Sequence, residues 1–132
     1  ARIVISYLKP GGTFFITEFH PFPWIFDYDH PSKLVIKYNY WHNAEPDSYD
    51  SPDAYASGGL KLKNTEEYGW AHPIGTVVSA LINAGLTIQW LHEYPFSVDR
   101  DQFKFMVKDP EGYWRLTGDP VPLMYSIKAT KL

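Results

Sequence analysis

The stretch that most constrains the fold is residues 8–12 (LKPGG), which lead directly into the mostly apolar run 13–19. Pro10 has no backbone N–H and biases Lys9 away from helical geometry, so the apolar helical turns before it must end there. The two glycines allow positive φ and a close reversal of the chain. The apolar run that follows is typical of a strand covered on both faces. These residues therefore predict a helix-to-strand turn in an α/β protein.

Composition limits the function classes. The 132 residues carry a net charge of -3 and contain no run of basic residues, which argues against a nucleic-acid or anionic-membrane partner. Cysteine is absent, so disulfides and thiolate metal sites are excluded, and the five histidines lack the close spacings of zinc sites. No apolar run approaches the roughly 20 residues that span a bilayer. We expect a single, soluble, cytoplasmic domain over residues 1–132, without a metal site.

Aromatic residues are abundant, with 5 Trp, 10 Tyr and 8 Phe making up 17% of the chain. Such a content suggests either a pocket lined by rings or a core built from large flat side chains.

Helical spacing of apolar residues predicts a helix over residues 74–84, with Pro73 at its start and Gly85 at its end. Ile74, Val77, Val78, Leu81 and Ile82 fall on one face of it. Residues 86–94 alternate as a strand, with Leu86, Ile88, Trp90, His92 and Tyr94 on one side, and residues 123–130 close the chain as another strand.

Between the first strand and this helix, the pattern predicts a long-looped hairpin. Residues 33–41 alternate with period two and are expected to pair antiparallel with residues 59–64. The polar, turn-rich residues 42–59 between them indicate a solvated loop. We therefore expect a hairpin or lid insertion over about 28–66.

The remaining segments carry weaker signals. Residues 21–32 contain three prolines and are predicted to form a loop, and residues 95–121 are irregular, with a short strand or helix at 103–107.

Several blocks, taken in order, resemble class I S-adenosylmethionine-dependent methyltransferases over nearly the whole chain. LKPGG with the strand ending Glu-Phe-His-Pro at residues 18–21 is similar to the entry into the family's fifth strand. YGWAHP at 68–73, followed by a helix, AGL at 84–86 and a strand ending EYP at 93–95, resembles the next helix and the sixth strand. PLMYSIKA at 122–129 is similar to the last strand.

The resemblance implies the C-terminal half of a Rossmann-like sheet, in which the last strand lies antiparallel between strands five and six. It also implies a cofactor, S-adenosylmethionine, held by the first four strands. The glycine-rich turn that does most of this holding has no counterpart here, because the chain contains no GxGxxG. We therefore assign no cofactor-binding residue, and expect an isolated fragment to be inactive.

A half-sheet also predicts a partner. Strand 13–19 would lack the neighbour that the family's fourth strand supplies, and an unpaired apolar edge is an aggregation hazard. We expect it to be covered in a homo-oligomer or by the missing half.

Candidate catalytic residues follow from the rule that ligands bind beyond the carboxyl ends of strands in open α/β sheets. Glu18 and His20 end the strand 13–19, and His72 precedes the predicted helix. Each could accept a proton from a substrate hydroxyl, amine or acidic carbon. The structural alternative is that His20 only caps its strand.

Candidate substrate-binding residues are Trp24, Tyr68, Trp70 and Glu93, which belong to the same end of the predicted sheet. Trp70 could instead pack against the helix entry, and Glu93 could be a solvated strand end.

The sequence thus favours a transferase fragment that supplies the wall of a small-molecule substrate site. The alternative is a non-enzymatic binding or assembly module that uses an aromatic surface and a free strand edge. A ligand-binding β-barrel would suit the alternating strands, but it explains neither LKPGG nor the helix at 74–84.

Overall fold

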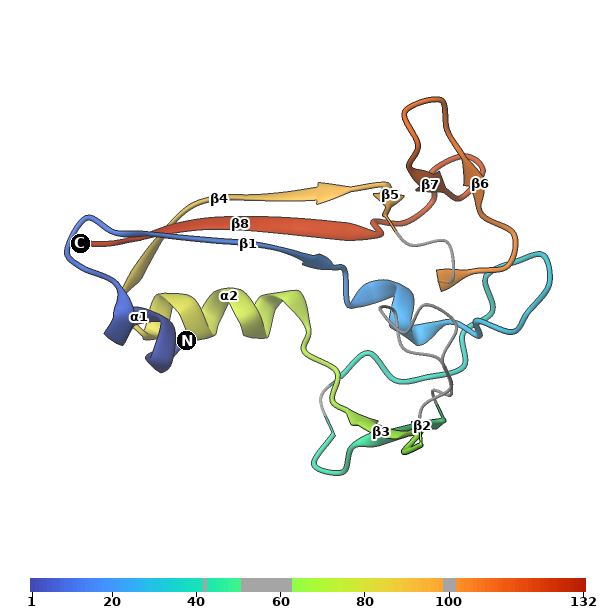
Figure 1. Ribbon diagram of the computed structural model, residues 1–132, viewed down its shortest axis with the longest axis horizontal. Helices are drawn as coiled ribbons and strands as arrows, with labels where there is room; N and C mark the ends of the chain where they lie inside the picture. Colours follow the sequence, from blue (N-terminus) through green and yellow to red (C-terminus); the bar gives the residue numbers. More distant parts are fainter. Residues whose placement is uncertain (42, 51–62, 99–101) are drawn as a thin grey trace.

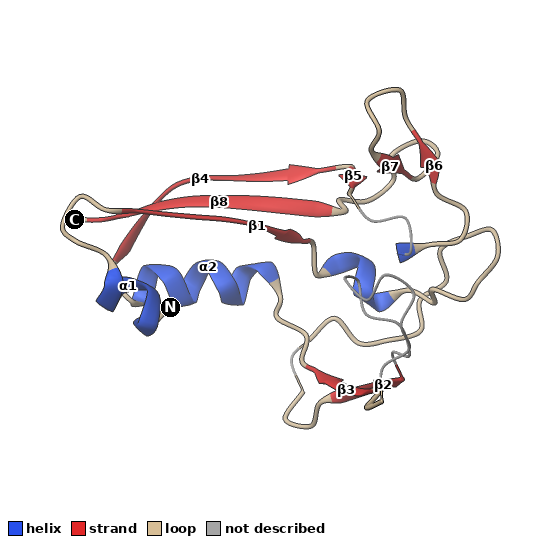
Figure 2. Ribbon diagram, in the orientation of Figure 1, coloured by secondary structure: helices blue, strands red, loops and turns tan. Residues whose placement is uncertain are grey.

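A three-stranded sheet with helices on one side forms the body of the described chain (Figures 1 and 2). The computed structural model describes residues 1–41, 43–50, 63–98 and 102–132. The sheet order is β1 (Thr13–Phe19), β8 (Met124–Lys131), β4 (Leu86–Tyr94). The helices are α1 (Arg2–Tyr7) and α2 (Ile74–Asn83).

The central strand β8 runs antiparallel to both of its neighbours, with Ile127 opposite Ile16 on one side and Leu91 on the other. Consequently β1 and β4 run parallel to each other, and their carboxyl ends lie at the same end of the sheet. The predicted order and directions of these three strands are confirmed. A parallel Rossmann-like sheet is not present among the described residues, which form a mixed α/β structure with small antiparallel sheets.

The LKPGG turn connects α1 to β1 as its composition predicts. Gly11 has a φ of 75°, and its N–H donates to the carbonyl of Lys131. At Gly12 a side chain would bring its Cβ within 2.8 Å of the Lys9 carbonyl oxygen. The turn therefore requires glycine for reasons of both backbone angle and space.

One hydrophobic core lies between the sheet and the helices. Its buried members are Leu81, Leu86, Tyr125, Ile127 and Ala129. Three of them are alternate residues of β8 (Tyr125, Ile127 and Ala129), so they share the face of this strand that points toward the helices. The predicted helical face is confirmed except at its last residue, because Ile82 is 52% exposed.

The predicted alternation of residues 86–94 is wrong beyond Ile88. A bulge between Ile88 and Trp90 shifts the register of β4 against β8. One extra residue moves the following side chains to the opposite face of a strand. Leu91 therefore packs in the core, whereas Trp90 stacks on His92 with ring centroids 4.4 Å apart.

A second hydrophobic core lies beyond the sheet, where the sequence predicts mostly loop. Its buried members are Ile25, Phe26, Phe103, Met106, Leu116 and Leu123. A 3-10 helix, η1 (Phe22–Ile25), replaces part of the predicted loop 21–32. The short strands β5 (Phe96–Ser97), β7 (Trp114–Arg115) and β6 (Val107–Lys108) form a small sheet in that order.

The prediction for residues 103–107 holds only at its end, where β6 begins at Val107. Phe103 and Met106 instead sit in turn geometry and fill the second core, which anchors this irregular segment.

The predicted hairpin is wrong in its pairing. The observed hairpin joins β2 (Asp47–Asp50) to β3 (Glu66–Gly69). Strand β2 lies inside the predicted loop 42–59, and β3 lies after the predicted partner strand 59–64. Residues 33–41 form no extended strand, because Leu34 and Tyr40 pack against the second core while Ile36 makes an isolated bridge to Phe26. The proposed partner strand, 59–64, lies largely outside the described residues, as does much of the predicted loop.

No described helix covers the sheet face opposite α1 and α2 (Figure 1). Aromatic side chains lie on this face. Phe15 on β1 is 58% exposed and meets Trp90 edge to face, with centroids 5.7 Å apart. Strand β1 pairs with β8 along one edge, and no described residue pairs with its other edge. Within the described ranges, this part of the sheet therefore presents an unpaired edge and an uncovered pair of aromatic side chains, Phe15 and Trp90.

Candidate functional site

A cavity of about 440 Å³ lies at the carboxyl end of β1, beside the N-terminus of α2. Three parts of the chain enclose it: the sheet end, the residues around η1 and those following it, and the β2–β3 hairpin. Its lining residues are Ile16, Glu18, Phe19, Pro21, Trp24, Tyr38, Asn39, Asp47, Tyr49, Gly69, Trp70, Ala71, His72, Val77 and Tyr125. A volume in this range suits a small-molecule ligand.

Local structure explains why these side chains meet. Glu18 shares a face of the sheet with Ile16 and lies opposite Tyr125 in the β1–β8 register. This face points toward α2 and packs in the core at Ile16. Glu18 lies on the same face beyond the N-terminus of α2, where the cavity begins. The hairpin register places Asp47 opposite Gly69, which brings Trp70 and Asp47 to the same end of the hairpin.

Carboxylates provide the ionised side chains of the lining. Glu18 and Asp47 line the cavity, and no lysine or arginine does so among the described residues. The Glu18 Oε1 atom accepts the backbone N–H of Phe19 at 2.9 Å, which leaves the rest of its carboxylate available for a ligand. Two acids within an otherwise mostly apolar lining give the cavity a negative character.

Two tyrosines of the lining, Tyr125 and Tyr49, remain protonated at neutral pH. Burial raises the pKa of Tyr125, and the Glu18 carboxylate adds to the rise. Burial also raises the pKa of Tyr49, with the Asp47 charge contributing. Desolvation and nearby negative charge both disfavour a phenolate. Neither tyrosine is therefore suited to act as a base.

His20 lies behind the cavity lining rather than in it. Only 3% of its surface is exposed. Its Nδ1 accepts the Phe22 N–H at 3.0 Å, so the proton sits on Nε2, which donates to Glu93 Oε1 at 2.8 Å. Burial lowers the pKa of His20, and the bond to Glu93 only partly opposes this. The neutral ring is thus fixed between two partners.

The predicted site residues separate into two groups. Glu18, His72, Trp24 and Trp70 all line the cavity, as the end-of-strand rule leads one to expect. Tyr68, Glu93 and His20 do not. Tyr68 points its hydroxyl to Glu66 at 2.7 Å, and Glu93 is bonded to His20.

Trp70 is not packed as a helix-entry residue. Its indole is 48% exposed and its Nε1 donates to the carbonyl of Ala44 at 3.4 Å. This bond ties the cavity wall to the chain that precedes β2.

Sequence reasoning missed Asp47, Tyr49, Asn39 and Tyr125 as lining residues. Tyr125 lies opposite Glu18 in the β1–β8 register, whereas the resemblance implies only the order and direction of these strands. The other three come from segments whose contacts are distant in sequence, and no local pattern marks them.

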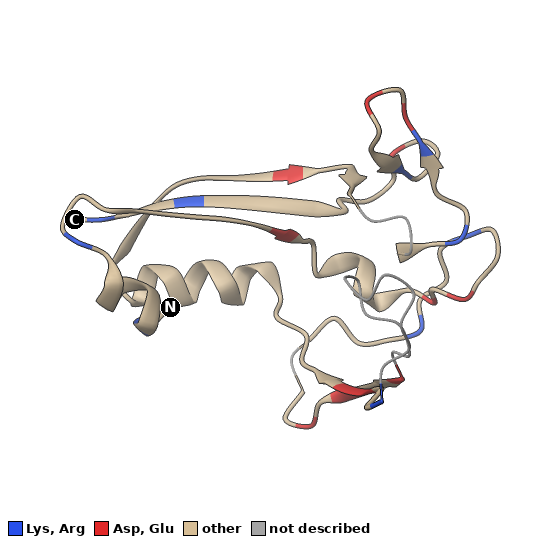
Figure 3. Cartoon of the chain, in the orientation of Figure 1, with Lys and Arg blue, Asp and Glu red and all other residues tan. Residues whose placement is uncertain are grey.

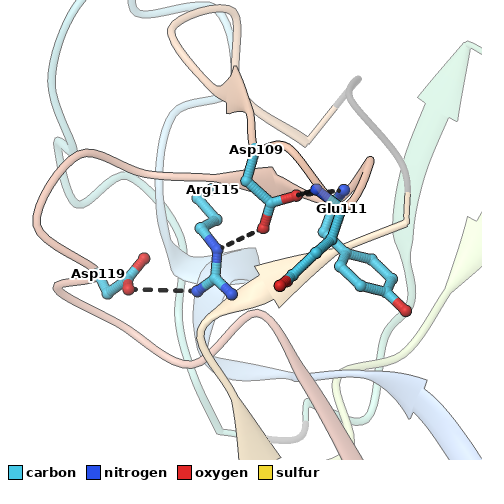
Figure 4. A network of polar contacts seen from close by, with 5 residues as sticks. Asp109, Glu111, Arg115 and Asp119 are labelled. Carbon is cyan, nitrogen blue, oxygen red and sulfur yellow. Dashed lines mark hydrogen bonds and ion pairs between the residues drawn. The ribbon is translucent and has the colours of Figure 1, made fainter.

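A separate polar network lies far along the chain, on the β6–β7 loop (Figure 4). Asp109 accepts the backbone N–H groups of Glu111 and Tyr113, and its other oxygen accepts Arg115 Nε at 2.8 Å. Arg115 also reaches Asp119 at 3.2 Å. The guanidinium holds the pKa of Asp109 below its usual range. With its acceptors satisfied by the loop, this network is structural.

Within the described ranges, no group of three or more histidine, aspartate or glutamate side chains is placed to hold a metal ion. The same residues contain no helix long and apolar enough to cross a bilayer. Comparison with known proteins gives no match: no protein-family model, no curated protein and no solved structure is significantly similar to this chain.

Proposed function

We propose that this chain is the C-terminal half of a class I S-adenosylmethionine-dependent methyltransferase, and that the cavity is the wall of its small-molecule substrate site. The observation that carries the proposal is the position of β8, antiparallel between two strands that run parallel to each other. The resemblance of LKPGG and the later blocks implies this order. The cavity at the carboxyl ends of these strands adds support.

The described residues do not suit the holding of S-adenosylmethionine. No described helix follows a strand through the glycine-rich turn that the resemblance implies for this cofactor, and α2 instead begins after Pro73 without a side-chain cap. The cofactor supplies an activated methyl group when bound, and we assign its binding to residues outside this chain.

The chain's own residues would orient the methyl acceptor and receive its proton. Glu18 is the best placed, because its carboxylate lines the cavity and keeps acceptor capacity beyond the bond to the Phe19 N–H. His72 lines the same cavity from the entry to α2. His20 acts as a positioning residue, since its bonds to Phe22 and Glu93 connect the two strand ends behind Glu18.

The test uses the complete product of the reading frame that contains this chain. We expect it to transfer a labelled methyl group from S-adenosylmethionine to a small molecule in a substrate panel. Glu18→Gln should lower kcat about 100-fold, which is typical for loss of a proton-accepting group. The matched control is Glu111→Gln, an exposed acid outside the cavity, which should leave kcat unchanged. A complete product that does not bind S-adenosylmethionine would contradict the proposal.

A second candidate function is supported by a different observation. The unpaired edge of β1 and the exposed Phe15 beside Trp90 are features of an assembly surface. A non-enzymatic module would use this surface to bind a partner strand. In that case the complete product would form a stable complex and transfer no methyl group.

A further inference from the structure

Four aromatic side chains of the cavity lining remain strongly exposed. The exposed fractions are 47% for Trp24, 48% for Trp70, 40% for Tyr38 and 37% for Tyr49. Rings that serve only to fill a core are buried, as Phe103 is at 1% in the second core. The faces of indole and phenol rings carry partial negative charge, and they attract cations within about 6 Å. The lining therefore offers ring surface that other side chains leave open.

The described lining of the cavity carries two carboxylates and no lysine or arginine. Glu18 lines it from the sheet and Asp47 from the hairpin. The hairpin strands add further acids, because β2 reads DSYD and β3 reads EEYG (Figure 3). These strands contain no basic residue.

One cation beside the lining is Lys37, which precedes the lining residue Tyr38 in the chain. Its Nζ lies 5.3 Å from the centroid of the Tyr38 ring, and it forms an ion pair with Asp27 at 3.1 Å. Asp27 offsets the charge of Lys37, so the field of Glu18 and Asp47 is not cancelled. The contact also shows that the Tyr38 ring accepts a cation in this structure.

We propose that the cavity binds an organic cation, a small substituted ammonium group held between the aromatic rings and the carboxylates of Glu18 and Asp47. Anionic ligands would meet two carboxylates and no lysine or arginine from the described lining residues. A neutral apolar ligand would contact the aromatic rings, but it would displace water from the two carboxylates without giving them a partner, which is unfavourable. An alkylated ammonium satisfies both, because its methyl groups are apolar and its charge is positive.

This inference names the substrate class of the proposed methyltransferase. It rests on the proposed function in one respect, which is that the cation is taken to be part of the methyl acceptor. Binding itself requires the cavity alone. The two can therefore be tested separately.

The first test compares two ligands of the same shape on the purified full chain. Choline carries a trimethylammonium group, and 3,3-dimethylbutan-1-ol replaces its nitrogen with carbon and is neutral. Calorimetry at matched ionic strength should show choline binding about tenfold more tightly, as expected for a partly desolvated cation on aromatic rings. Equal affinities within twofold, or no binding of choline, would overturn the inference. This comparison requires no variant and so does not depend on mutant folding.

The second test locates the site. Glu18→Gln and Asp47→Asn each remove one charge with little change in shape, and each should weaken choline binding about fivefold. Trp70→Leu should do the same by removing a ring, with near-UV circular dichroism confirming that the variant is folded. Glu111→Gln, on the β6–β7 loop, should leave affinity within twofold of the parent. Choline binding that none of the three cavity variants changes would place the site elsewhere and overturn the inference.

The outcomes also separate the two proposals. Binding of choline by the cavity, without methyl transfer by the complete product, supports the cation site and contradicts the methyltransferase. Methyl transfer to neutral or anionic acceptors only, with no ammonium binding, supports the methyltransferase and overturns the cation site.

Discussion

The Nε2 atom of His20 lies 2.8 Å from Oε1 of Glu93 and joins the carboxyl ends of β1 and β4, two strands that β8 separates. The ring of His20 packs edge to face against Tyr125 of β8, with centroids 6.0 Å apart. One imidazole thus contacts all three strands at the end of the sheet where the cavity lies. We infer that its main role is to fix the positions of Glu18 and Tyr125.

Stability should fall as the pH drops below 6.5, the ordinary pKa of histidine. Burial lowers the pKa of His20 in the folded chain, so the unfolded chain binds more protons below that pH. Glu93 opposes the shift, and Glu93→Gln should therefore lower the folded-state pKa further and steepen the loss. Urea unfolding at pH 7 and pH 5 measures this for both proteins. If the parent were as stable at pH 5 as at pH 7, or if the variant lost less than the parent, the assigned role would be wrong.

How far the sequence predicts this fold depends on whether a signal is local. The strands 13–19 and 123–130 and the helix at 74–84 carry regular apolar patterns next to a glycine or proline, and the structure has them within a residue or so. The bulge at Ile88–Trp90 leaves no local mark, because it depends on register against β8. A regular alternation read from the sequence therefore reversed the faces of Trp90 and Leu91.

Residues 33–41 show a different error, because the sequence predicts a strand there that the structure does not form. Their period suggested a strand, but the backbone N–H groups of Lys37 and Tyr38 both donate to the carbonyl of Ile25 instead of to a partner strand. Tertiary contacts with the second core decide the conformation there. For the same reason Asp47 and Tyr49 could not be assigned to the cavity, although Glu18 and Trp24 could.

Gly85, which ends α2, should be intolerant of alanine. Its φ is 95°, and an added Cβ would lie 3.2 Å from Ile5 Cδ1. We expect Gly85→Ala to reduce the free energy of unfolding by about 1–2 kcal/mol, since the backbone strain and the contact add. The matched control is Gly75→Ala, inside α2, where an added Cβ meets nothing within 4 Å. That variant should be up to about 1 kcal/mol more stable, because alanine favours the helix. Chemical denaturation measures the free energy of unfolding of the two variants, and equal changes would contradict the assignment of backbone strain to position 85.

Lys131 should contribute to stability from the end of β8. Its ammonium donates to the carbonyls of Ile5 and Leu8 at 2.9 and 2.8 Å, which satisfies acceptors at the C-terminus of α1. Replacement by methionine keeps most of the apolar stem and leaves two carbonyls without this donor. We expect Lys131→Met to cost about 1–3 kcal/mol, measured by thermal or urea unfolding. Lys128→Met, in the same strand, leaves both bonds intact and should cost less; a larger loss there would argue against this role.

The isolated 132-residue chain should bind S-adenosylmethionine weakly or not at all, because the proposal assigns the cofactor to residues outside it. Calorimetry with the cofactor and with S-adenosylhomocysteine measures this directly. Micromolar affinity of the isolated chain for either compound would contradict that assignment. It would also require a cofactor site among the residues of this chain, and variants of Glu18 and Asp47 would show whether that site is the cavity.

The open edge of β1 should mediate self-association of the isolated chain. Strand β1 is seven residues long and pairs with β8 in an unbroken register, whereas the other outer strand, β4, carries a bulge. Bulges and lysines protect edges from pairing, so β1 is the less protected of the two. Thr17→Lys on β1 should therefore shift the chain toward monomer in sedimentation experiments. Thr87→Lys on β4 is the matched control, and it should leave the association unchanged. If only Thr87→Lys produced monomer, the interface would lie on β4, and the view of β1 as the strand that lacks its neighbour would fail.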